Sequence, residues 1–366
     1  MMKYFTLLMS VFLIFGCEKE DSNAGNPSSE SSLYFPPLNS EEWQKTSPDD
    51  LGWNTSKIDD LLNFLEYNNS RAFIVIKNGK IVIEEYFGNN VLGTLPFGKN
   101  SQWYWASAGK TLTSTLIGIA QQEGVLDIEN PSSEYLGMGW TSLTNEKEQL
   151  IKVKHQLTMT TGLEYIVPNL NCTLDSCLSY KSDAGVQWFY HNATYTLLEQ
   201  VVANASGMDY NDYTNLKIES KIGMNGNWIK QNYSNVYWST ARDMARFGLL
   251  MQNKGVWENT TVLSDSEFYN QMITPSQDLN LSYGYLWWLN GKESIIAPGT
   301  SFPINKSLSE NAPKDLFAGM GKNGQFLDII PSKSLIVVRM GEAPGDSLVP
   351  ISFHDEMWQK INLLIP

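Results

Sequence analysis

The stretch Ala72-Phe-Ile-Val-Ile-Lys-Asn-Gly-Lys-Ile-Val-Ile-Glu-Glu-Tyr86 is the part of this 366-residue chain that decides the fold. Two β-branched runs flank Asn78-Gly79. An Asn-Gly pair between such runs is the strongest short-range signal of a β-hairpin, because its tight turn needs positive φ at both central residues. The sequence therefore predicts two antiparallel strands in this early part of the chain.

Strand-like sequence returns near the other end of the chain. Three segments there are rich in β-branched or aromatic residues, at 283–289, 325–330 and 335–340. Three segments in between favour helices, at 107–119, 194–204 and 239–253. Strands at both ends around a helical middle predict an α+β fold, in which one antiparallel sheet flanked by helices carries an inserted helical lobe. We expect the sheet lobe at about 51–106 and 283–366, and the helical lobe at about 107–282.

The composition is that of a globular chain, with 42% hydrophobic residues, 18% charged residues and a formal net charge of -13. Only four Arg occur, so the chain lacks the positive field that concentrates proteins on phosphate backbones, and we expect no nucleic-acid partner. The three His residues, at 155, 191 and 354, form neither an HExxH pattern nor a Cys/His cluster. We therefore expect no metal site.

The N-terminus has the layout of an export signal. Lys3 precedes an apolar run from Tyr4 to Phe15, which is too short to span a bilayer, and Gly16-Cys17 follows. A small residue before Cys resembles the end of a bacterial lipoprotein signal, which implies a signal peptide at 1–16 and lipidation of Cys17. A buried N-terminal helix, or an ordinary cleaved signal with an incidental Cys, would give a similar pattern.

This resemblance implies an exported protein at the outer membrane or cell surface, on the periplasmic or external side, that contacts the membrane through a lipid anchor. The sequence from 17 to 50 is rich in Ser, Asn, Pro and Glu, which predicts a tether. The apolar spacing of Ile58-Asp-Asp-Leu-Leu-Asn-Phe-Leu65 fits one face of a helix. We therefore expect the folded unit at 51–366.

Export would place the two remaining cysteines, Cys172 and Cys177, in an oxidising compartment. Two thiols this close in sequence could pair in a tight loop, form half of a metal site, or stay free. The chain has no second Cys pair that would complete a metal site. We therefore favour a local disulfide.

Ser107-Ala-Gly-Lys110 is the only SxxK in the chain, and it opens the helix expected at 107–119. Residues three apart share a helix face, so the Lys110 amine can lie against the Ser107 hydroxyl. The positive end of the helix dipole favours an anionic oxygen at this place. Burial beside Trp103 and Trp105 would lower the pKa of Lys110 toward that of a usable base. A plain helix start would show the same spacing.

Tyr190-His-Asn192 stands just before the helix expected at 194–204. A phenol and an amide two residues apart in an extended segment project to the same side. Together they can supply a proton relay and a donor to a substrate carbonyl. The alternative is that Tyr190 is simply a core aromatic residue beside Trp188.

Lys322-Asn-Gly324 stands at the entry to the strand expected at 325–330. A cation there can hold a substrate carboxylate, and a glycine lets a ligand approach the backbone. The alternative is a solvated cation in a turn, as in Lys77-Asn-Gly79, which the hairpin already explains. Gly319 to Gly324 also spells GxGxxG, but we reject dinucleotide binding because a strand follows where a helix is needed.

In this order, the Ser107, Tyr190 and Lys322 motifs resemble those of the penicillin-recognising serine hydrolases. That family includes class C β-lactamases, D-alanyl-D-alanine peptidases, related esterases and 6-aminohexanoate-dimer hydrolases. The resemblance extends to the segments at 151–163 and 239–248. It implies a β-lactamase/transpeptidase-like fold.

The resemblance also implies the catalytic roles. Ser107 would be the acylated nucleophile and Lys110 the amine that activates it. Tyr190 would be the phenol that carries protons to the leaving group and later to water. Asn192 would contact the substrate amide.

Three residues of the third motif would bind substrate by the same resemblance, namely Lys322, Gly324 and Gln325. The backbone N–H groups of Ser107 and Gln325 would form the oxyanion hole. The pattern Gly-x-x-Gly-Gln, from Gly321 to Gln325, is more similar to the esterase and amide-hydrolase branch than to the β-lactamases.

The resemblance thus implies a serine hydrolase that cleaves an amide or ester bond of a small molecule or peptide through an acyl-enzyme, without a cofactor. Two alternatives stay open. One is a D,D-peptidase or β-lactamase that acts on cell-wall peptides or penicillins. The other is a non-catalytic binding lipoprotein that keeps the same fold.

Overall fold

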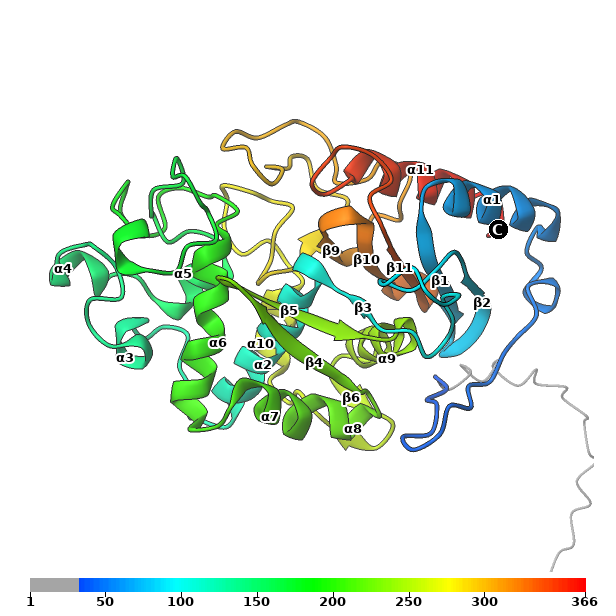
Figure 1. The fold of residues 1–366 in the computed structure, drawn as a ribbon, viewed down its shortest axis with the longest axis horizontal. Helices are drawn as coiled ribbons and strands as arrows, with labels where there is room; N and C mark the ends of the chain where they lie inside the picture. The colour runs from blue at the N-terminus through cyan, green and yellow to red at the C-terminus, as the bar shows by residue number, and fades with distance from the viewer. Residues whose placement is uncertain (1–32) are drawn as a thin grey trace, which may run out of the picture. The chain divides into compact units, whose positions relative to one another are not determined.

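The main β-sheet takes its strands from both ends of the described chain (Figure 1). Its strand order is β2-β1-β11-β10-β9-β8, and each neighbouring pair is antiparallel. The strands are β1 (Ser70–Lys77), β2 (Lys80–Tyr86), β8 (Trp288–Leu289), β9 (Phe317–Gly321), β10 (Gln325–Ile330) and β11 (Leu335–Gly341). The predicted α+β arrangement is confirmed.

A computed structural model describes residues 33–366, which cluster as one unit. The predicted signal peptide at 1–16, the lipidation site Cys17 and the first part of the predicted tether lie outside the described residues. Those expectations stay predictions. Within 33–366, the helices are all too short or too polar to cross a membrane.

The predicted hairpin at 72–86 is confirmed as β1 and β2. Lys77 pairs with Lys80 across the turn, and Asn78 and Gly79 adopt φ angles of 52° and 82°. A Cβ atom at Gly79 would lie 1.8 Å from the carbonyl oxygen of Tyr34. The turn therefore requires glycine both for its φ angle and for the close approach of the N-terminal segment.

Helices cover both faces of the main sheet (Figure 1). The helices α1 (Ile58–Tyr67) and α11 (Ile351–Ile361) pack together on one face, and α9 (Ala241–Gln252) packs on the other. Side chains along β10 alternate accordingly. Asp328 contacts α11 through His354, whereas Leu327 lies against Gly248 of α9.

The remaining helices lie mostly in a lobe beside the sheet, on the left of Figure 1. Its central helix is α2 (Lys110–Gln122), in which every residue from Lys110 to Ala120 is buried. The helix α6 (Asn192–Ser206) packs against α2. The shorter helices are α3 (Ser133–Leu136), α4 (Asn145–Glu148), α5 (Val153–Leu157), α7 (Tyr210–Thr214), α8 (Ser220–Ile222) and α10 (Ser266–Met272).

The predicted helical lobe at 107–282 is not purely helical. It contributes β4 (Gly226–Gln231) and β5 (Ser234–Ser239) to a second sheet with β3 (Trp103–Tyr104), and it also forms the short pair β6 (Val256–Trp257) and β7 (Thr260–Thr261). The β4–β5 turn places Asn232 at a φ of 54° without a glycine, and β4 buries only two residues. Neither the turn nor the hydrophobic pattern therefore gave a clear strand signal.

The strand predicted at 283–289 is wrong over most of its length. Only Trp288–Leu289, the strand β8, pairs with β9. Before it the chain reverses, because the Gly284 N–H donates to the Trp287 carbonyl and Leu286 adopts a φ of 63°. The aromatic richness of this segment reflects its burial rather than extended structure.

The predicted tether at 17–50 is too long, because the folded unit begins by Leu33. Trp43 is buried and donates from Nε1 to the Gly79 carbonyl at 2.7 Å. Lys45 forms a parallel bridge with Ile81. A polar segment can thus be held by a few specific contacts that composition does not reveal.

Candidate active site

Ser107 and Lys110 lie where a short 3₁₀ turn, Ala106–Gly109, leads into α2. The Lys110 Nζ atom donates to the Ser107 Oγ atom over 3.0 Å. Trp105, just before the turn, is fully buried and donates from its indole to the Ser239 hydroxyl at 2.8 Å. The turn is therefore anchored to β5, and the expected contact between amine and hydroxyl is present.

Tyr190 and Asn192 approach the same amine from the start of α6. Lys110 Nζ also donates to Asn192 Oδ1 over 3.1 Å. The Tyr190 ring centroid lies 4.9 Å from Nζ, and the Ser107 hydroxyl is near enough to the Tyr190 phenol to affect its pKa. The structure thus brings four of the predicted site residues together: Ser107, Lys110, Tyr190 and Asn192.

Contacts behind Tyr190 hold its ring in place. The ring stacks on Trp288 with centroids 5.7 Å apart, and it meets the edge of Tyr283 at 6.1 Å. Trp188 and Tyr283 also contact each other edge to face, with centroids 5.4 Å apart. Part of the segment at 283–289 therefore forms the back wall of the site.

The loop before α6 is tied down by the disulfide between Cys172 and Cys177, whose Cα atoms are 5.9 Å apart. The carbonyl of Leu170, two residues before Cys172, accepts from the Ala193 N–H at 2.9 Å, directly beside Asn192. The His191 ring lies within 3.3 Å of the Glu164 carbonyl and is buried, which suits a structural role.

Burial controls the charge of the two titratable groups. Lys110 is 3% exposed, and burial lowers its pKa to about 7. Burial raises the pKa of Tyr190 above its usual value, against a smaller opposing effect of the Ser107 hydroxyl. Near neutral pH the amine can therefore be neutral and act as a base, while the phenol keeps its proton and can act only as a donor or relay.

The site keeps an open side, because Ser107 and Asn192 are only half-buried. Lys110 and Tyr190 lie beneath them and are 3% and 6% exposed. A substrate carbonyl can thus reach the hydroxyl and the amide while the amine and the phenol stay desolvated. This is the arrangement that nucleophilic catalysis by Ser requires.

The third predicted motif stands at the entry to β10, as expected. Asn323 and Gly324 adopt φ angles of 64° and 77°, so Lys322-Asn-Gly324 is the tight turn between β9 and β10, much like Lys77-Asn-Gly79. Lys322 is exposed. The alternative of a cation in a turn therefore describes its conformation correctly, and carboxylate binding by Lys322 stays a prediction.

Gly324 and Gln325 are tied to β11 rather than to Ser107. The guanidinium of Arg339 is fully buried and donates to the carbonyls of Asn323 and Gly324. A Cβ at Gly324 would lie 2.7 Å from Arg339 Nη1, so the glycine makes room for this side chain. The Gln325 side chain is fully buried and exchanges two hydrogen bonds with the Gly341 backbone, at 2.6 and 3.0 Å.

Gly321, which sequence reasoning did not assign to the site, is the β9 residue that packs against the nucleophile turn. A Cβ there would lie 3.0 Å from the backbone nitrogens of Ser107 and Ala108 and 2.6 Å from the Trp105 carbonyl oxygen. Only glycine allows this close approach. The GxGxxG pattern, rejected as a nucleotide loop, contained the signal for this contact, because glycines also occur where two backbone segments approach closely.

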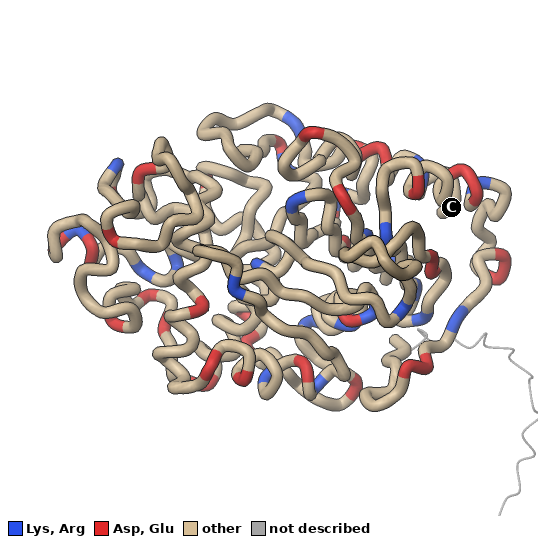
Figure 2. Tube along the Cα trace, in the orientation of Figure 1, with Lys and Arg blue, Asp and Glu red and all other residues tan. Residues whose placement is uncertain are grey.

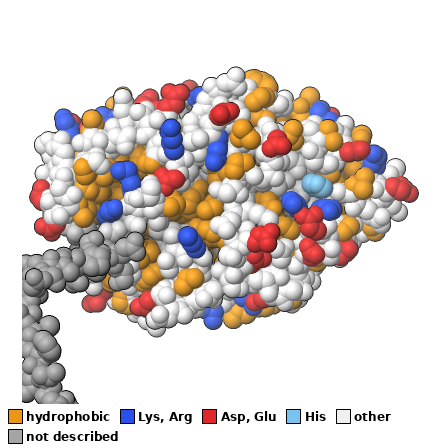
Figure 3. Space-filling model, turned by 180° about the vertical axis from the view of Figure 1, so that it is seen from behind, with side chains coloured by type: hydrophobic (Ala, Val, Ile, Leu, Met, Phe, Trp, Pro, Cys, Tyr) orange, Lys and Arg blue, Asp and Glu red, His pale blue; other side chains and the backbone are white. Residues whose placement is uncertain are grey.

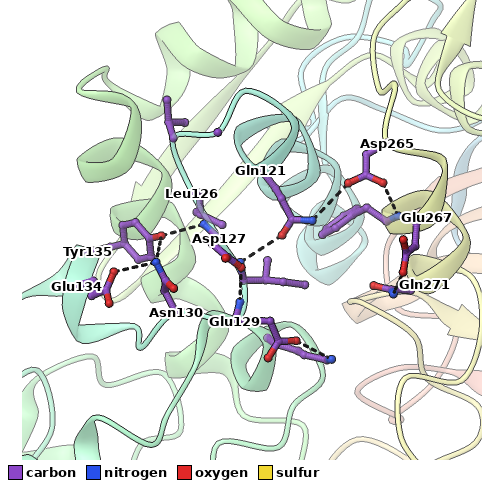
Figure 4. Close-up of a pocket in the computed structure, with 15 residues that line it drawn as sticks. Gln121, Leu126, Asp127, Glu129, Asn130, Glu134, Tyr135, Asp265, Glu267 and Gln271 are labelled. Atoms are coloured by element: carbon purple, nitrogen blue, oxygen red, sulfur yellow. Dashed lines mark hydrogen bonds and ion pairs between the residues drawn. The ribbon is translucent and has the colours of Figure 1, made fainter.

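Charged groups elsewhere do not suggest a second reactive centre. Acidic and basic residues are scattered along the trace, and both kinds lie among apolar side chains on the face seen from behind (Figures 2 and 3). A separate cavity of about 820 Å³ is lined by five carboxylate side chains and does not include Ser107. Figure 4 shows the residues that line it. Its side chains bond to one another, as in the pairs Asn130–Glu134 and Gln121–Asp265. Across residues 33–366, no cluster of three His, Cys, Asp or Glu could hold a metal ion.

Comparison with protein families gives a match over most of the chain. The family model described as Beta-lactamase matches residues 69–346. The chain belongs to the Beta-lactamase family. The 6-aminohexanoate-dimer hydrolase of Paenarthrobacter ureafaciens is 20% identical over 327 residues, which cover 79% of this chain and 76% of that protein.

Two solved structures share the fold of this Beta-lactamase family member. One comes from Bacillus anthracis and is provisionally named a 6-aminohexanoate-dimer hydrolase; it has a TM-score of 0.66 and 19% identity, and the match covers 90% of this chain and 89% of that one. The other is a penicillin-binding protein from Bacillus halodurans, with a TM-score of 0.61, 18% identity and coverage of 83% and 99%. At these identities the likeness establishes the fold, and the β-lactamase-like fold predicted from the motifs is confirmed.

Proposed function

We propose that this Beta-lactamase family member is a serine hydrolase that cleaves an amide or ester bond through an acyl-enzyme on Ser107. The observation that carries the proposal is the buried Lys110 amine, held between Ser107 Oγ at 3.0 Å and Asn192 Oδ1 at 3.1 Å. A structural lysine would be expected to reach solvent or a carboxylate. Here its polar neighbours are a half-buried hydroxyl and an amide instead.

The proposed reaction begins when neutral Lys110 accepts the Ser107 proton and Oγ attacks the substrate carbonyl carbon. The new oxyanion would be held by backbone N–H groups where the Ser107 turn meets β9, at the close contact with Gly321. The proton then passes to the leaving group through the Tyr190 phenol, and the bond to the leaving group breaks. Water then attacks the acyl carbon and gives up a proton to the same groups. The bond to Ser107 Oγ breaks, the acid is released, and Oγ regains its proton.

The oxyanion partner predicted at Gln325 lies on β10, in the position opposite Gly321. Gly321 itself contacts the nucleophile turn, so we assign the second donor to the end of β9 rather than to Gln325. The proposed reaction is unchanged by this assignment. Only the second oxyanion donor differs, since it lies on β9 instead of β10.

The amidase or esterase alternative is preferred to a D,D-peptidase or β-lactamase on two grounds. The pattern from Gly321 to Gln325 is more similar to the esterase and amide-hydrolase branch. A relative that aligns with 79% of this chain is named a 6-aminohexanoate-dimer hydrolase, a name that specifies a linear amide. We therefore expect short esters and linear amides as substrates.

Hydrolysis of p-nitrophenyl acetate by the wild type and by Ser107→Ala tests the proposal. We expect turnover in the wild type and a loss of at least about 10³-fold in the variant, with an acetyl adduct on the Ser107 peptide after rapid quenching. Equal turnover in both proteins would refute the role of Ser107. A folded wild type without turnover or adduct would favour the non-catalytic binding lipoprotein.

A fluorescent penicillin separates the remaining alternatives. Stable labelling of Ser107 would support a D,D-peptidase, and rapid turnover of the penicillin would support a β-lactamase. We expect neither, together with ready turnover of the ester.

We also propose that the protein is exported and anchored to a membrane by a lipid on Cys17, which lies outside the described residues. The disulfide between Cys172 and Cys177 supports export, because such bonds persist in oxidising compartments. The variant Cys17→Ser should move the protein from the membrane fraction to the soluble fraction. An unchanged distribution would contradict the anchor.

A further inference from the structure

A fourth group lies beside the Lys110 amine, in addition to Ser107, Asn192 and Tyr190, and it is not part of the recognised motifs. Tyr195 lies one turn after Asn192 on α6, and its ring centroid is 4.0 Å from Lys110 Nζ, closer than the 4.9 Å of the Tyr190 ring. The Tyr195 side chain is buried. A cation or an N–H group this close to a ring face is attracted by the negative face of the π system.

The three nearest neighbours of Nζ, which lie within 4.0 Å, differ in whether they donate or accept a hydrogen. Asn192 Oδ1 is an acceptor, and the face of the Tyr195 ring can likewise only receive a hydrogen. The Ser107 hydroxyl, at 3.0 Å, accepts from the charged amine and can instead donate to the neutral amine. A neutral amine has two N–H groups and one lone pair. When the N–H groups point to Asn192 and Tyr195, the lone pair is left for the Ser107 hydroxyl.

We propose that Tyr195 is a positioning residue, whose ring face takes one N–H of Lys110 and so directs the lone pair of the amine at the Ser107 hydroxyl. The inference rests on the proposed function, because the lone pair matters only if Lys110 removes the Ser107 proton. Tyr195 neither gives nor takes a proton in the proposed reaction. It acts through the orientation of Lys110.

The Tyr195 ring is itself held in place. The Tyr210 hydroxyl donates to the Thr113 hydroxyl at 2.8 Å, and Thr113, which lies one turn after Lys110 on α2, is near enough to the Tyr195 phenol to oppose the rise of its pKa. Burial raises the pKa of Tyr195, so its phenol stays neutral. The buried ring thus lies where α6 packs against both α2 and α7.

Few other charges act on the amine. The titratable groups that face Lys110 are the phenols of Tyr190 and Tyr195, while the 3₁₀ turn before α2 contributes the neutral Ser107 hydroxyl. Glu199 lies one turn beyond Tyr195 on α6, and Tyr283 stands behind Tyr190. None of these groups replaces the ring face of Tyr195.

The matched variants Tyr195→Leu and Tyr195→Phe test this role. Leu removes the ring face, so we expect kcat for p-nitrophenyl acetate to fall about tenfold with KM nearly unchanged. The acidic limb of the pH profile should also move down by about 0.4 to 1.5 pH units, because protonated Lys110 loses its attraction to the ring. The variant Tyr195→Phe keeps the ring, so its kcat and the acidic limb of its pH profile should stay at the wild-type values.

Two outcomes would overturn the inference: a wild-type acidic limb in a folded Tyr195→Leu variant, or an equal loss in Tyr195→Phe, which would point to the hydroxyl. Thermal unfolding checks that the variants are folded, and Tyr195→Met replaces the Leu variant if that one does not fold. Turnover that survives in Ser107→Ala would instead show that the proposed function has failed. An inactive Ser107→Ala with a fully active Tyr195→Leu would refute the positioning role alone.

Discussion

Two buried polar clusters can be compared in this molecule. The open cluster consists of Ser107, Lys110, Tyr190 and Asn192. The sealed cluster lies between β10 and α11, where Asp328 Oδ2 accepts from His354 Nε2 at 2.8 Å and from Trp358 Nε1 at 2.7 Å. All three side chains of the sealed cluster are fully buried, whereas Ser107 in the open cluster is only half-buried.

The difference shows which feature distinguishes a buried polar cluster that can catalyse a reaction from one that only stabilises the fold. Asp328 and His354 form an acid and imidazole pair of the kind used in catalysis, yet no solvent reaches them and neither touches a nucleophile within residues 33–366. Their bonds attach α11 to the sheet. The open cluster combines a desolvated base with a nucleophile that a substrate can reach, and this combination supports a reaction.

The largest expected effect is the loss of turnover in Lys110→Ala. Removal of the base should lower ester turnover by about 10²-fold to 10⁴-fold. The unfolding temperature should not fall much, because the variant removes a buried amine that is costly to charge. Steady-state kinetics and thermal unfolding measure the two effects. Wild-type turnover in a folded variant would contradict the assignment of Lys110.

The variant Asp328→Ala should show the opposite behaviour. It leaves two buried donors, from His354 and Trp358, without their acceptor, so the free energy of unfolding should fall by about 2 to 5 kcal/mol. Turnover per folded molecule should stay near that of the wild type. Denaturant unfolding measures the first quantity, and active-site titration corrects the second. A loss of turnover without a loss of stability would remove the distinction between the two clusters.

The smallest of the three effects is expected for the double variant Cys172→Ser/Cys177→Ser. The disulfide closes a short loop, and its loss should lower the free energy of unfolding by about 2 kcal/mol. Turnover should fall only modestly, because Leu170 and Ala193 still bond beside Asn192. Reduction of the wild type by dithiothreitol provides the control. A complete loss of turnover would show that the loop belongs to the open cluster.

Much of the fold could be predicted from local sequence patterns. The hairpin turn at Asn78-Gly79 and the strands β10 and β11 carry strong signals, because β-branched runs next to tight turns have few other solutions. The contact between Ser107 and Lys110 follows from spacing of three residues at a helix start. Tyr190 and Asn192 could be placed beside them only through the order of the motifs.

The remaining features depend on contacts between distant segments. The turn Lys322-Asn-Gly324 resembles a binding motif in sequence, but its glycine serves Arg339, which lies 15 residues further along the chain. Gly321 contacts Ser107 across more than 200 residues. No local pattern specifies such packing, and the ordered segment at 33–50 was missed for the same reason, since its polar composition hides the buried Trp43.

The most direct test of the central claim, that buried Lys110 is the base for Ser107, is the pH dependence of kcat/KM for p-nitrophenyl acetate. Protonated Lys110 cannot accept a proton, and burial lowers its pKa to about 7, so kcat/KM should rise through about pH 7 and level off above about pH 8. In Lys110→Ala this limb should disappear along with most of the activity. A wild-type profile that still rises toward pH 10, or the same limb in Lys110→Ala, would contradict the account.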